Sequence, residues 1–258
     1  RALWVLGKSG SPAESVGVAE RAMRDKNADL RIVGLRLARQ IEYDVVQAVG
    51  RLVDDPSPRV RRECLVALKT TNSGKVPGLW ARLAAGYDGR DRWYLEALGI
   101  AADGRWDACL AAWEKQAPDA ADSPGGRNIT WRSRGTKTAA RLAGIISDEK
   151  TPTDDLLRYL RALDYQPAKP RQDAALALVI GDHGKDPDRA GLVIREALTR
   201  VGPVDLGANR DARQAINRVV ERQRGTPGFV SLVGRFGLKA RYPELVQMAR
   251  RNPDTQLG

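Results

Sequence analysis

Apolar residues recur at helical spacing in the stretch DPSPRVRRECLVAL, which runs from residue 55 to residue 68. They stand at positions i, i+4, i+7 and i+8, which share one helix face: Val60, Cys64, Ala67 and Leu68. Charged residues are predicted on the other, solvated face: Arg59, Arg61, Arg62 and Glu63. Asp55 and Pro56 end the preceding helix, because proline has no N–H group to continue the hydrogen-bond ladder. The stretch predicts a turn followed by a helix with one buried stripe.

The same pattern returns about thirty residues away in both directions. Upstream, in the stretch 25–38, Leu30 and Arg31 correspond to Val60 and Arg61. Downstream, the stretch 93–98 repeats the end of the same helix. A period near thirty with two helices per unit is typical of a stacked α-solenoid, in which each unit buries its apolar stripe against its neighbours.

Further helices are predicted from apolar stripes and start signals. Ser11, Pro12 and Glu14 form a capping box that starts the helix 11–25. Thr151 and Pro152 are predicted to cap a helix with a leucine stripe: Leu156, Leu157, Leu160 and Leu163. The other predicted helices cover 45–52, 76–85, 90–101, 106–116, 136–147, 170–180, 187–201, 209–222, 227–236 and 243–251. No alternating strand pattern is present.

The segment 117–130, APDAADSPGGRNIT, interrupts this rhythm with two prolines and two glycines. It has few apolar residues to offset the entropy of ordering it. We therefore predict an irregular, exposed and mobile insert between a regular first part (1–116) and a less regular second part (131–258).

The stretch 55–61 resembles the D-P-x-x-x-V-R signature of HEAT repeats, which is matched by Asp55, Pro56, Val60 and Arg61. We therefore predict an all-α fold, a HEAT-like α-solenoid that forms a right-handed superhelix of antiparallel helix pairs. The whole range 1–258 is predicted to be a single solenoid. The chain has no initiator Met, and both of its ends, including a turn at 252–258, resemble parts of repeats. We expect a piece of a longer protein.

The charge of the chain does not identify a specific partner. The net charge of +11 arises from 43 basic and 32 acidic residues, and 201–258 is more basic than 151–200. Such a surface could meet an acidic protein, anionic lipid or nucleic acid, although solvated helix faces explain most of it. No run of eighteen apolar residues occurs, so the sequence predicts no membrane span.

The residues that usually carry chemistry are scarce. Cys64 and Cys109 lie among apolar helical neighbours, and we predict two buried free thiols. His183 is the only histidine, which excludes a histidine-rich metal site, and we predict a solvated loop side chain. Asp182, Asp186 and Asp188 crowd one turn, but they lack the glycine and glutamate spacing of a calcium-binding EF-hand loop. We therefore assign no catalytic, cofactor-binding or metal-binding residue.

All six tryptophans lie in the first 131 residues, and several stand beside arginines. The candidate interaction surface consists of Arg92, Trp93, Arg105, Trp106, Trp131 and Arg132. Basic residues interleaved with aromatics could grip a single-stranded or flipped base, as in HEAT-like DNA glycosylases. The alternative, which we favour, is that these aromatics fill space between repeats.

Three stretches carry a narrower resemblance: DRWYLEALGIAADGRWDACLAAW (91–113), WRSRGTKTAARLAGII (131–146) and YLRALDYQP (159–167). They resemble the HEAT-repeat middle region of planctomycete and verrucomicrobial membrane-bound dehydrogenase-type proteins. In that family a β-propeller precedes the repeats and a c-type haem-binding domain follows them. The resemblance implies a periplasmic or membrane-associated protein; without it, the expectation is a cytoplasmic one. The C-x-x-C-H haem-attachment motif is absent from this chain, so haem c is expected only in a further C-terminal domain.

These features predict a non-catalytic scaffold or protein-interaction module. The resemblance implies that it links a dehydrogenase-like propeller to a cytochrome domain, so that its partners are flanking domains of the same chain or another protein. The parent would then be an exported redox enzyme. The alternative is a nucleic-acid-binding HEAT-like solenoid related to DNA alkylation-repair glycosylases, which the charge and the tryptophans favour.

Overall fold

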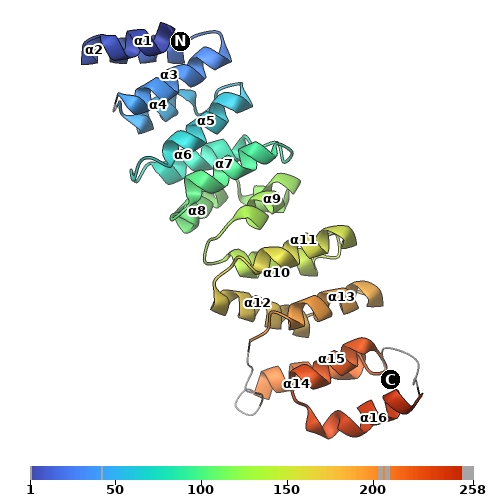
Figure 1. Ribbon diagram of the computed structural model, residues 1–258. Helices are drawn as coiled ribbons and strands as arrows, with labels where there is room; N and C mark the ends of the chain where they lie inside the picture. The colour runs from blue at the N-terminus through green and yellow to red at the C-terminus, as the bar shows by residue number, and fades with distance from the viewer. Residues whose placement is uncertain (1, 42, 203–205, 207–209, 252–258) are drawn as a thin grey trace. The chain divides into compact units, whose positions relative to one another are not determined.

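The computed structural model describes residues 2–41, 43–202, 206 and 210–251 (Figure 1). Over these residues the chain is all-α, with sixteen α-helices packed in sequential pairs and two short 3₁₀ helices. The predicted all-α class is confirmed. The helix start predicted at Asn209 and the turn predicted at 252–258 lie outside the described residues.

The chain divides into two compact units, Arg1–Gly135 and Thr136–Gly258. The first unit contains α1 (Ala2–Ser9), α2 (Pro12–Met23), α3 (Ala28–Gln40), α4 (Val45–Leu52), α5 (Pro58–Leu68), α6 (Val76–Ala85), α7 (Arg92–Ala102), α8 (Trp106–Gln116), η1 (Pro118–Asp122) and α9 (Pro124–Arg132). The second contains α10 (Thr138–Ser147), α11 (Thr153–Leu163), α12 (Ala168–Ile180), α13 (Pro187–Leu198), α14 (Arg210–Arg222), α15 (Pro227–Arg235), η2 (Lys239–Arg241) and α16 (Tyr242–Arg251). That the two units continue one solenoid stays a prediction.

In the first unit the helices form two rows. Helices α3, α5, α7 and α9 each contact the next member of one row, and α4, α6 and α8 form the other row (Figure 1). Contacts between consecutive helices join the rows, as between α3 and α4, α4 and α5, and α6 and α7. The row of α3, α5 and α7 therefore presents one continuous series of helix faces.

Local sequence signals account for the helix starts and the core. The capping box before α2 is present: the Ser11 side chain accepts a hydrogen bond from the Glu14 N–H, and the Glu14 carboxylate accepts one from the Ser11 N–H at 2.7 Å. The predicted stripe of α5 is fully buried in the core of the first unit: Val60, Cys64, Ala67 and Leu68. The solvated face was predicted incorrectly at one position, because Glu63 is buried.

The thirty-residue period reappears as a repeated hydrogen-bond pattern. Arg31 Nη1 donates to the carbonyl oxygens of Asp25 and Lys26, both at 2.9 Å. Arg61 Nη1 donates to the equivalent carbonyl oxygens of Asp55 and Pro56, at 2.6 and 3.3 Å. Each arginine therefore binds the turn that precedes its own helix, where carbonyl groups lack intrahelical partners.

The same arginines also reach the next turn along the row. Arg31 Nε and Nη2 donate to the two carboxylate oxygens of Asp55 at 2.7 and 2.8 Å, and this ion pair is largely removed from solvent. Arg61 Nη2 donates to the carbonyl oxygen of Gly86 at 3.1 Å. Each guanidinium group thus joins two consecutive repeats.

The insert predicted at 117–130 is not an irregular loop. Its first part forms η1, which is largely exposed, and its second part begins α9. The Ser123 hydroxyl accepts the Gly126 N–H at 3.0 Å and caps α9, while Ile129 and Thr130 are buried. The prolines and glycines therefore mark a helix start, because proline is tolerated in the first helical turn. A Cβ atom at Gly126 would lie 1.9 Å from the Ala120 carbonyl oxygen, so glycine permits this close approach.

Two details of the second unit differ from the sequence predictions. Leu156, Leu160 and Leu163 of α11 are buried, but Leu157 is exposed, because it is rotated by about 100° from Leu156 and lies beside the stripe. Thr151 does not cap α11; its hydroxyl donates to the Ile145 carbonyl oxygen at 2.5 Å, and Pro152 is the N-cap residue.

A matched pair of glycines tests the helix packing. Replacing Gly34 of α3 by Ala would place a Cβ atom 2.7 Å from the Met23 nitrogen and 2.9 Å from the Ala19 carbonyl oxygen, both backbone atoms of the α2 segment. Gly50 of α4 is exposed, and a Cβ atom there would meet nothing within 4 Å. We expect Gly34→Ala to destabilise the protein by about 1 to 3 kcal/mol.

We expect Gly50→Ala to stabilise the protein by about 0.5 to 1 kcal/mol, because alanine loses less conformational entropy in a helix. Urea unfolding of both variants checks these signs. A neutral Gly34→Ala variant would contradict the close approach of α2 and α3.

Candidate functional site

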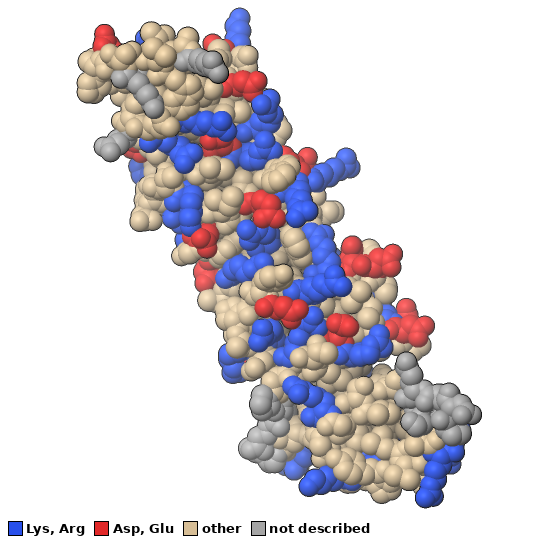
Figure 2. Space-filling view, in the orientation of Figure 1, with Lys and Arg blue, Asp and Glu red and all other residues tan. Residues whose placement is uncertain are grey.

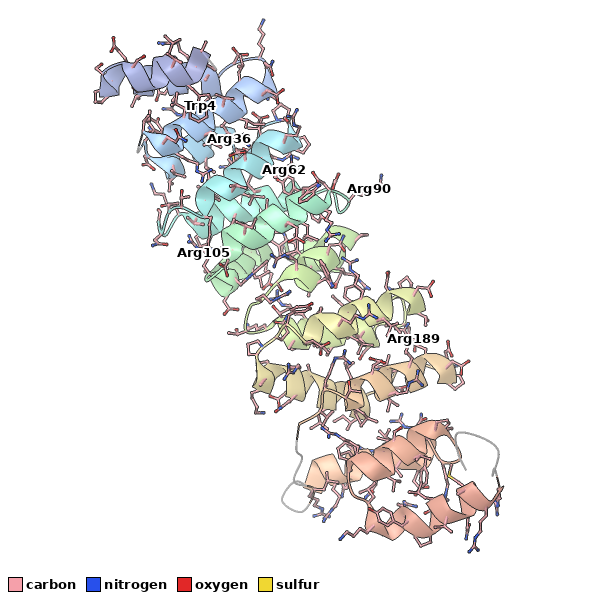
Figure 3. The ribbon with its side chains drawn as sticks, viewed as in Figure 1. Trp4, Arg36, Arg62, Arg90, Arg105 and Arg189 are labelled. Atoms are coloured by element: carbon pink, nitrogen blue, oxygen red, sulfur yellow. The ribbon has the colours of Figure 1, made fainter. Side chains whose placement is uncertain are left out.

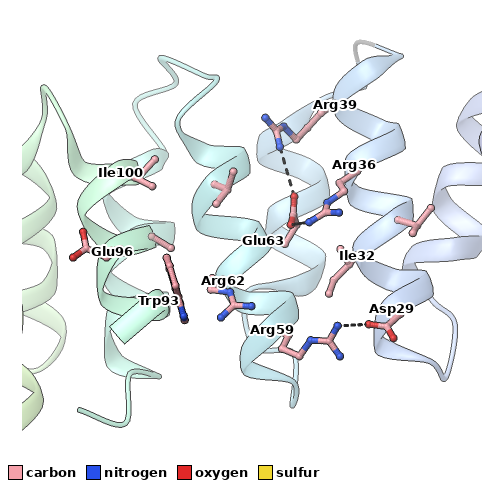
Figure 4. A pocket seen from close by; sticks show the side chains of 13 residues that line it. Asp29, Ile32, Arg36, Arg39, Arg59, Arg62, Glu63, Trp93, Glu96 and Ile100 are labelled. Atoms are coloured by element: carbon pink, nitrogen blue, oxygen red, sulfur yellow. Dashed lines mark hydrogen bonds and ion pairs between the residues drawn. The ribbon is translucent and has the colours of Figure 1, made fainter. Parts of the chain in front are cut away.

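A groove of the first unit runs across the row of α3, α5 and α7 (Figure 4). Its volume is about 840 Å³. The apolar part of its lining consists of Ile32, Val33, Val66, Trp93, Ala97 and Ile100, and the charged part of Asp29, Arg36, Arg39, Arg59, Arg62, Glu63 and Glu96. The groove thus combines an apolar floor with a rim that is rich in arginine.

One carboxylate at the α3 end of the groove is shared by two arginines. Arg36 Nη2 donates to Glu63 Oε2 at 2.7 Å, and Arg39 Nη1 lies 3.6 Å from Glu63 Oε1. The Glu63 side chain is only 10% exposed, so these contacts offset the cost of burying its charge. The hydrogen bond to Glu63 raises the pKa of Arg36. With two cations and one anion, the cluster carries one net positive charge.

The remaining charged groups of the groove pair between neighbouring helices. Arg59 Nη2 lies 2.6 Å from Asp29 Oδ1, and both side chains are exposed. Glu96 accepts a hydrogen bond from Arg132 Nε at 2.8 Å. Arg62 lies farther from its acidic neighbour, with 3.7 Å between Nη1 and Asp91 Oδ2. The exposed Arg59–Asp29 pair stabilises little, so its guanidinium group remains available to a ligand, and the long Arg62–Asp91 distance leaves Arg62 only weakly paired.

The structure brings one predicted surface residue into the groove. Trp93, on α7, lines it and is 71% exposed, which is unusual for a tryptophan. Arg92, the preceding residue, is exposed but does not line the groove.

The other predicted surface residues lie elsewhere. Trp106 is buried and packs edge-on against Trp80, with ring centroids 6.0 Å apart, so its inclusion in the surface was wrong. Trp131 is partly buried against the core, and the neighbouring Arg132 reaches the groove only through Glu96. Arg105 donates to the Thr71 carbonyl oxygen at 2.7 Å and binds a turn. Space filling, the favoured reading of the aromatics, therefore holds for Trp106.

Several residues that line the groove were not predicted from the sequence as part of a site: Ile32, Arg36, Arg39, Val66 and Ile100. The sequence nevertheless contains a signal. Arg36 and Arg39 are three residues apart on α3, and Arg59 and Arg62 are three residues apart on α5. When the two helices are aligned by thirty residues, the four positions share one helix face, which predicts arginines on the same side of α3 and α5.

Basic side chains are widespread on the visible face of the first unit, but acidic ones are interspersed with them and no continuous basic patch forms (Figure 2). Figure 3 shows Trp4, Arg36 and Arg62 following one another along α1, α3 and α5. A smaller cavity of about 390 Å³ lies beside the groove and is lined by Trp4, Arg36, Arg39, Gln40 and Thr70. The shared arginine cluster therefore separates two hollows of this face.

The two thiols are free and buried, as predicted. Burial raises the pKa of Cys64 and raises that of Cys109 to about 12. Neither thiol is therefore ionised near neutral pH, and neither resembles an activated nucleophile. Across the part of the chain that the structure describes, no three His, Cys, Asp or Glu side chains cluster in a way that could hold a metal ion. Asp186 caps α13 by accepting the N–H groups of Asp188 and Arg189.

His183 was predicted to be solvated, but its side chain is only 3% exposed. Its Nε2 atom contacts the Leu178 carbonyl oxygen, which fixes this nitrogen as the donor, and Nδ1 has no hydrogen-bond partner among the described residues. Burial lowers the pKa of His183; the charges of Arg189 and Arg222 lower it further, and Asp182 and the Leu178 carbonyl oppose them. The neutral ring is therefore a core side chain of the second unit.

No described helix is both long and apolar enough to cross a membrane. No protein family matches this chain, and no curated protein and no solved structure is detectably similar to it.

The buried histidine predicts a pH-dependent stability. Because the folded-state pKa of His183 lies below its ordinary value of about 6.5, the unfolded chain binds the proton first as the pH falls. Its contribution is fully present above about pH 6.5 and declines below it, by at most about 1.4 kcal/mol per pH unit.

Urea unfolding at neutral and mildly acidic pH checks this decline. We expect His183→Gln to show a smaller loss of stability on acidification than the unsubstituted chain, since carboxylates titrate alike in both. Equal losses would contradict the assignment.

Proposed function

We propose that this chain is a non-catalytic helical-repeat scaffold that binds other polypeptide segments. The observation that carries the proposal is the open groove along α3, α5 and α7, where an exposed tryptophan lies beside a rim of arginines. Stacked helical repeats use such continuous faces as binding surfaces.

The finer architecture that we propose is a HEAT-like α-solenoid, wound as a right-handed superhelix. Sequential helix pairing supports it, and so does the hydrogen-bond pattern that Arg31 and Arg61 repeat thirty residues apart. A repeat that bonds to the next through equivalent residues can be extended without changing its packing. The free energy of unfolding of such a solenoid is approximately the sum of contributions from individual repeats and from the interfaces between neighbouring repeats.

A non-catalytic role is supported by the positions of the two cysteines and the histidine. Cys64 and Cys109 are buried with raised pKa values, and His183 is buried in the second unit. None of these groups lines the groove. A general base or nucleophile must lie within hydrogen-bond reach of a bound substrate, and these three do not meet that requirement at the groove.

Within a longer parent protein, we propose that the scaffold links a dehydrogenase-like propeller to a c-type cytochrome domain. The support for this is the resemblance of 91–113, 131–146 and 159–167 to the middle region of such proteins. In that setting the chain would hold the catalytic and electron-accepting domains apart, and haem c would be bound outside it.

A nucleic-acid-binding function is the second candidate, and the net charge of +11 favours it. The arginines of the groove nevertheless face carboxylates, as in Arg59–Asp29 and Arg36–Glu63. A phosphate backbone would have to displace the carboxylates of Asp29 and Glu63 or lie close to them. Either would reduce the favourable electrostatic energy of binding a nucleic acid.

Salt dependence separates the two candidates. The scaffold is expected to bind duplex DNA no more tightly than the nonspecific range of about 10⁻⁴ to 10⁻⁶ M at physiological salt. Fluorescence anisotropy with labelled duplex DNA at low and physiological salt checks this. A tighter complex that loses about a thousandfold or more in affinity as salt rises would instead establish the nucleic-acid function.

The linking role is tested by the reading frame of the parent. We expect a C-x-x-C-H sequence after residue 258 and a β-rich domain before residue 1, and the purified parent should show the absorption spectrum of covalent haem. A frame that encodes only further helical repeats would remove the redox context and leave the binding scaffold.

A further inference from the structure

We propose that the groove of α3, α5 and α7 binds an extended acidic peptide segment that carries one large apolar side chain. This inference rests on the proposed scaffold function and specifies the partner of its groove. The apolar side chain covers Trp93, and the carboxylates of the segment bind Arg62 and the cluster of Arg36, Glu63 and Arg39.

The α7 end of the groove supplies the apolar contact. Trp93 is 71% exposed and Ile100 is 43% exposed, and both line the groove, with Val66 of α5 nearby on its floor. Leaving such area in water is unfavourable, at roughly 25 cal/mol for each Å² of apolar surface. Tryptophan and arginine are also enriched among the residues that contribute most to binding energy at protein interfaces. A leucine-sized side chain placed here would remove water from both residues.

The α3 end supplies the charge. Glu63 is shared by Arg36 and Arg39 and has little exposed surface of its own, whereas the Arg36 side chain is 54% exposed. Of the three nitrogens of the Arg36 guanidinium group, only Nη2 donates to Glu63, so the outer edge of the group is open to a ligand carboxylate. Hydrogen bonds between guanidinium and carboxylate groups are among the stronger ones in proteins. The uncompensated positive charge of the cluster favours an acidic ligand over a neutral one.

The distance between neighbouring helices of the row determines how far apart the carboxylate and the apolar side chain of the ligand must lie. Packed helices lie about 8 to 10 Å apart, so the arginine cluster of α3 is about 16 to 20 Å from the apolar contact of α7. An extended chain rises about 3.3 Å per residue, which places the ligand carboxylate about five or six residues from its apolar side chain. Arg62 of α5 lies between, and Figure 4 shows it beside Trp93, where a second carboxylate can bind.

The composition of the groove favours a peptide over a nucleic acid. Asp29, Glu63 and Glu96 line the same groove as the arginines. A nucleic acid carries a phosphate at every nucleotide and would meet these carboxylates, whereas a peptide can place its acids only opposite the arginines. The apolar floor also matches an aliphatic side chain, which nucleic acids lack.

The probe is a fluorescein-labelled peptide with a central leucine and with glutamates at alternate positions on both sides, separated by serines. This design serves either chain direction and puts the leucine and the glutamates on one side of an extended strand. We expect saturable binding by fluorescence anisotropy. Replacing the leucine by serine, or every glutamate by lysine, should weaken binding at least tenfold.

Two variants of the chain identify the groove. Trp93→Ala and Arg36→Gln should each weaken binding about tenfold; the glutamine retains a hydrogen-bond donor for Glu63, and Trp93 contributes little to the core because it is exposed. The matched controls are Tyr165→Ala, an exposed aromatic residue of the second unit, and Lys115→Gln, an exposed cation on α8. Both should bind like the unsubstituted chain, and thermal unfolding should show that all four remain folded.

The outcomes separate the groove from the scaffold function. Absence of binding to the acidic peptide, or equal binding by Trp93→Ala, overturns the groove assignment. A different outcome is that peptides from the parent reading frame bind equally well to the unsubstituted chain and to the Trp93→Ala and Arg36→Gln variants. That result would support the scaffold function but would show that its binding site is not this groove. A single-stranded oligonucleotide that binds more tightly than the acidic peptide at the same salt, and that loses affinity in Arg36→Gln, would overturn both proposals.

Discussion

Within each unit, guanidinium groups that satisfy backbone carbonyls at the turns constrain how one repeat stacks on the next. Helix ends leave carbonyl groups without intrahelical partners, and burying them unpaired costs about 1 to 3 kcal/mol each. Arg31 and Arg61 supply the missing donors in the first unit. In the second unit the buried Arg189 donates to the carbonyl oxygens of Ile146, Asp148 and Thr151 (Figure 3). Arginine suits this position because its planar fork reaches several acceptors at once.

The high arginine content of the chain follows partly from this architecture. Many basic side chains cross from one repeat to the next: Arg31–Asp55, Arg51–Glu20, Arg59–Asp29, Lys69–Asp103 and Arg132–Glu96. A high arginine content is therefore a structural requirement of the stack before it is a sign of an anionic partner. The groove combines such an ion-pair cluster, in which Glu63 is shared by two arginines, with a tryptophan, Trp93, that is left in solvent.

The helices could be predicted from the sequence because each has a strong local signal, such as the capping box of Ser11 and Glu14 or the apolar stripe of α5. The failures concern residues whose environment comes from other helices. Glu63 was assigned to solvent, yet α3 brings two arginines to it; His183 was assigned to a solvated loop, yet the second unit closes over it. The helix α9 was missed because glycines at its start permit a close backbone approach that no periodicity reveals. The groove depends on three helices at once, and only Trp93 was anticipated.

The two cysteines have a practical consequence for spectroscopy. Cys64 is fully buried and Cys109 lies in the same core, and burial keeps both thiols protonated at the pH values used for labelling. Maleimide and nitroxide reagents need an accessible thiolate, so the native chain already provides a silent background. Single cysteines introduced at exposed helix positions could then carry spin labels or fluorophores, and the distances between them would report directly how the two units are placed in solution.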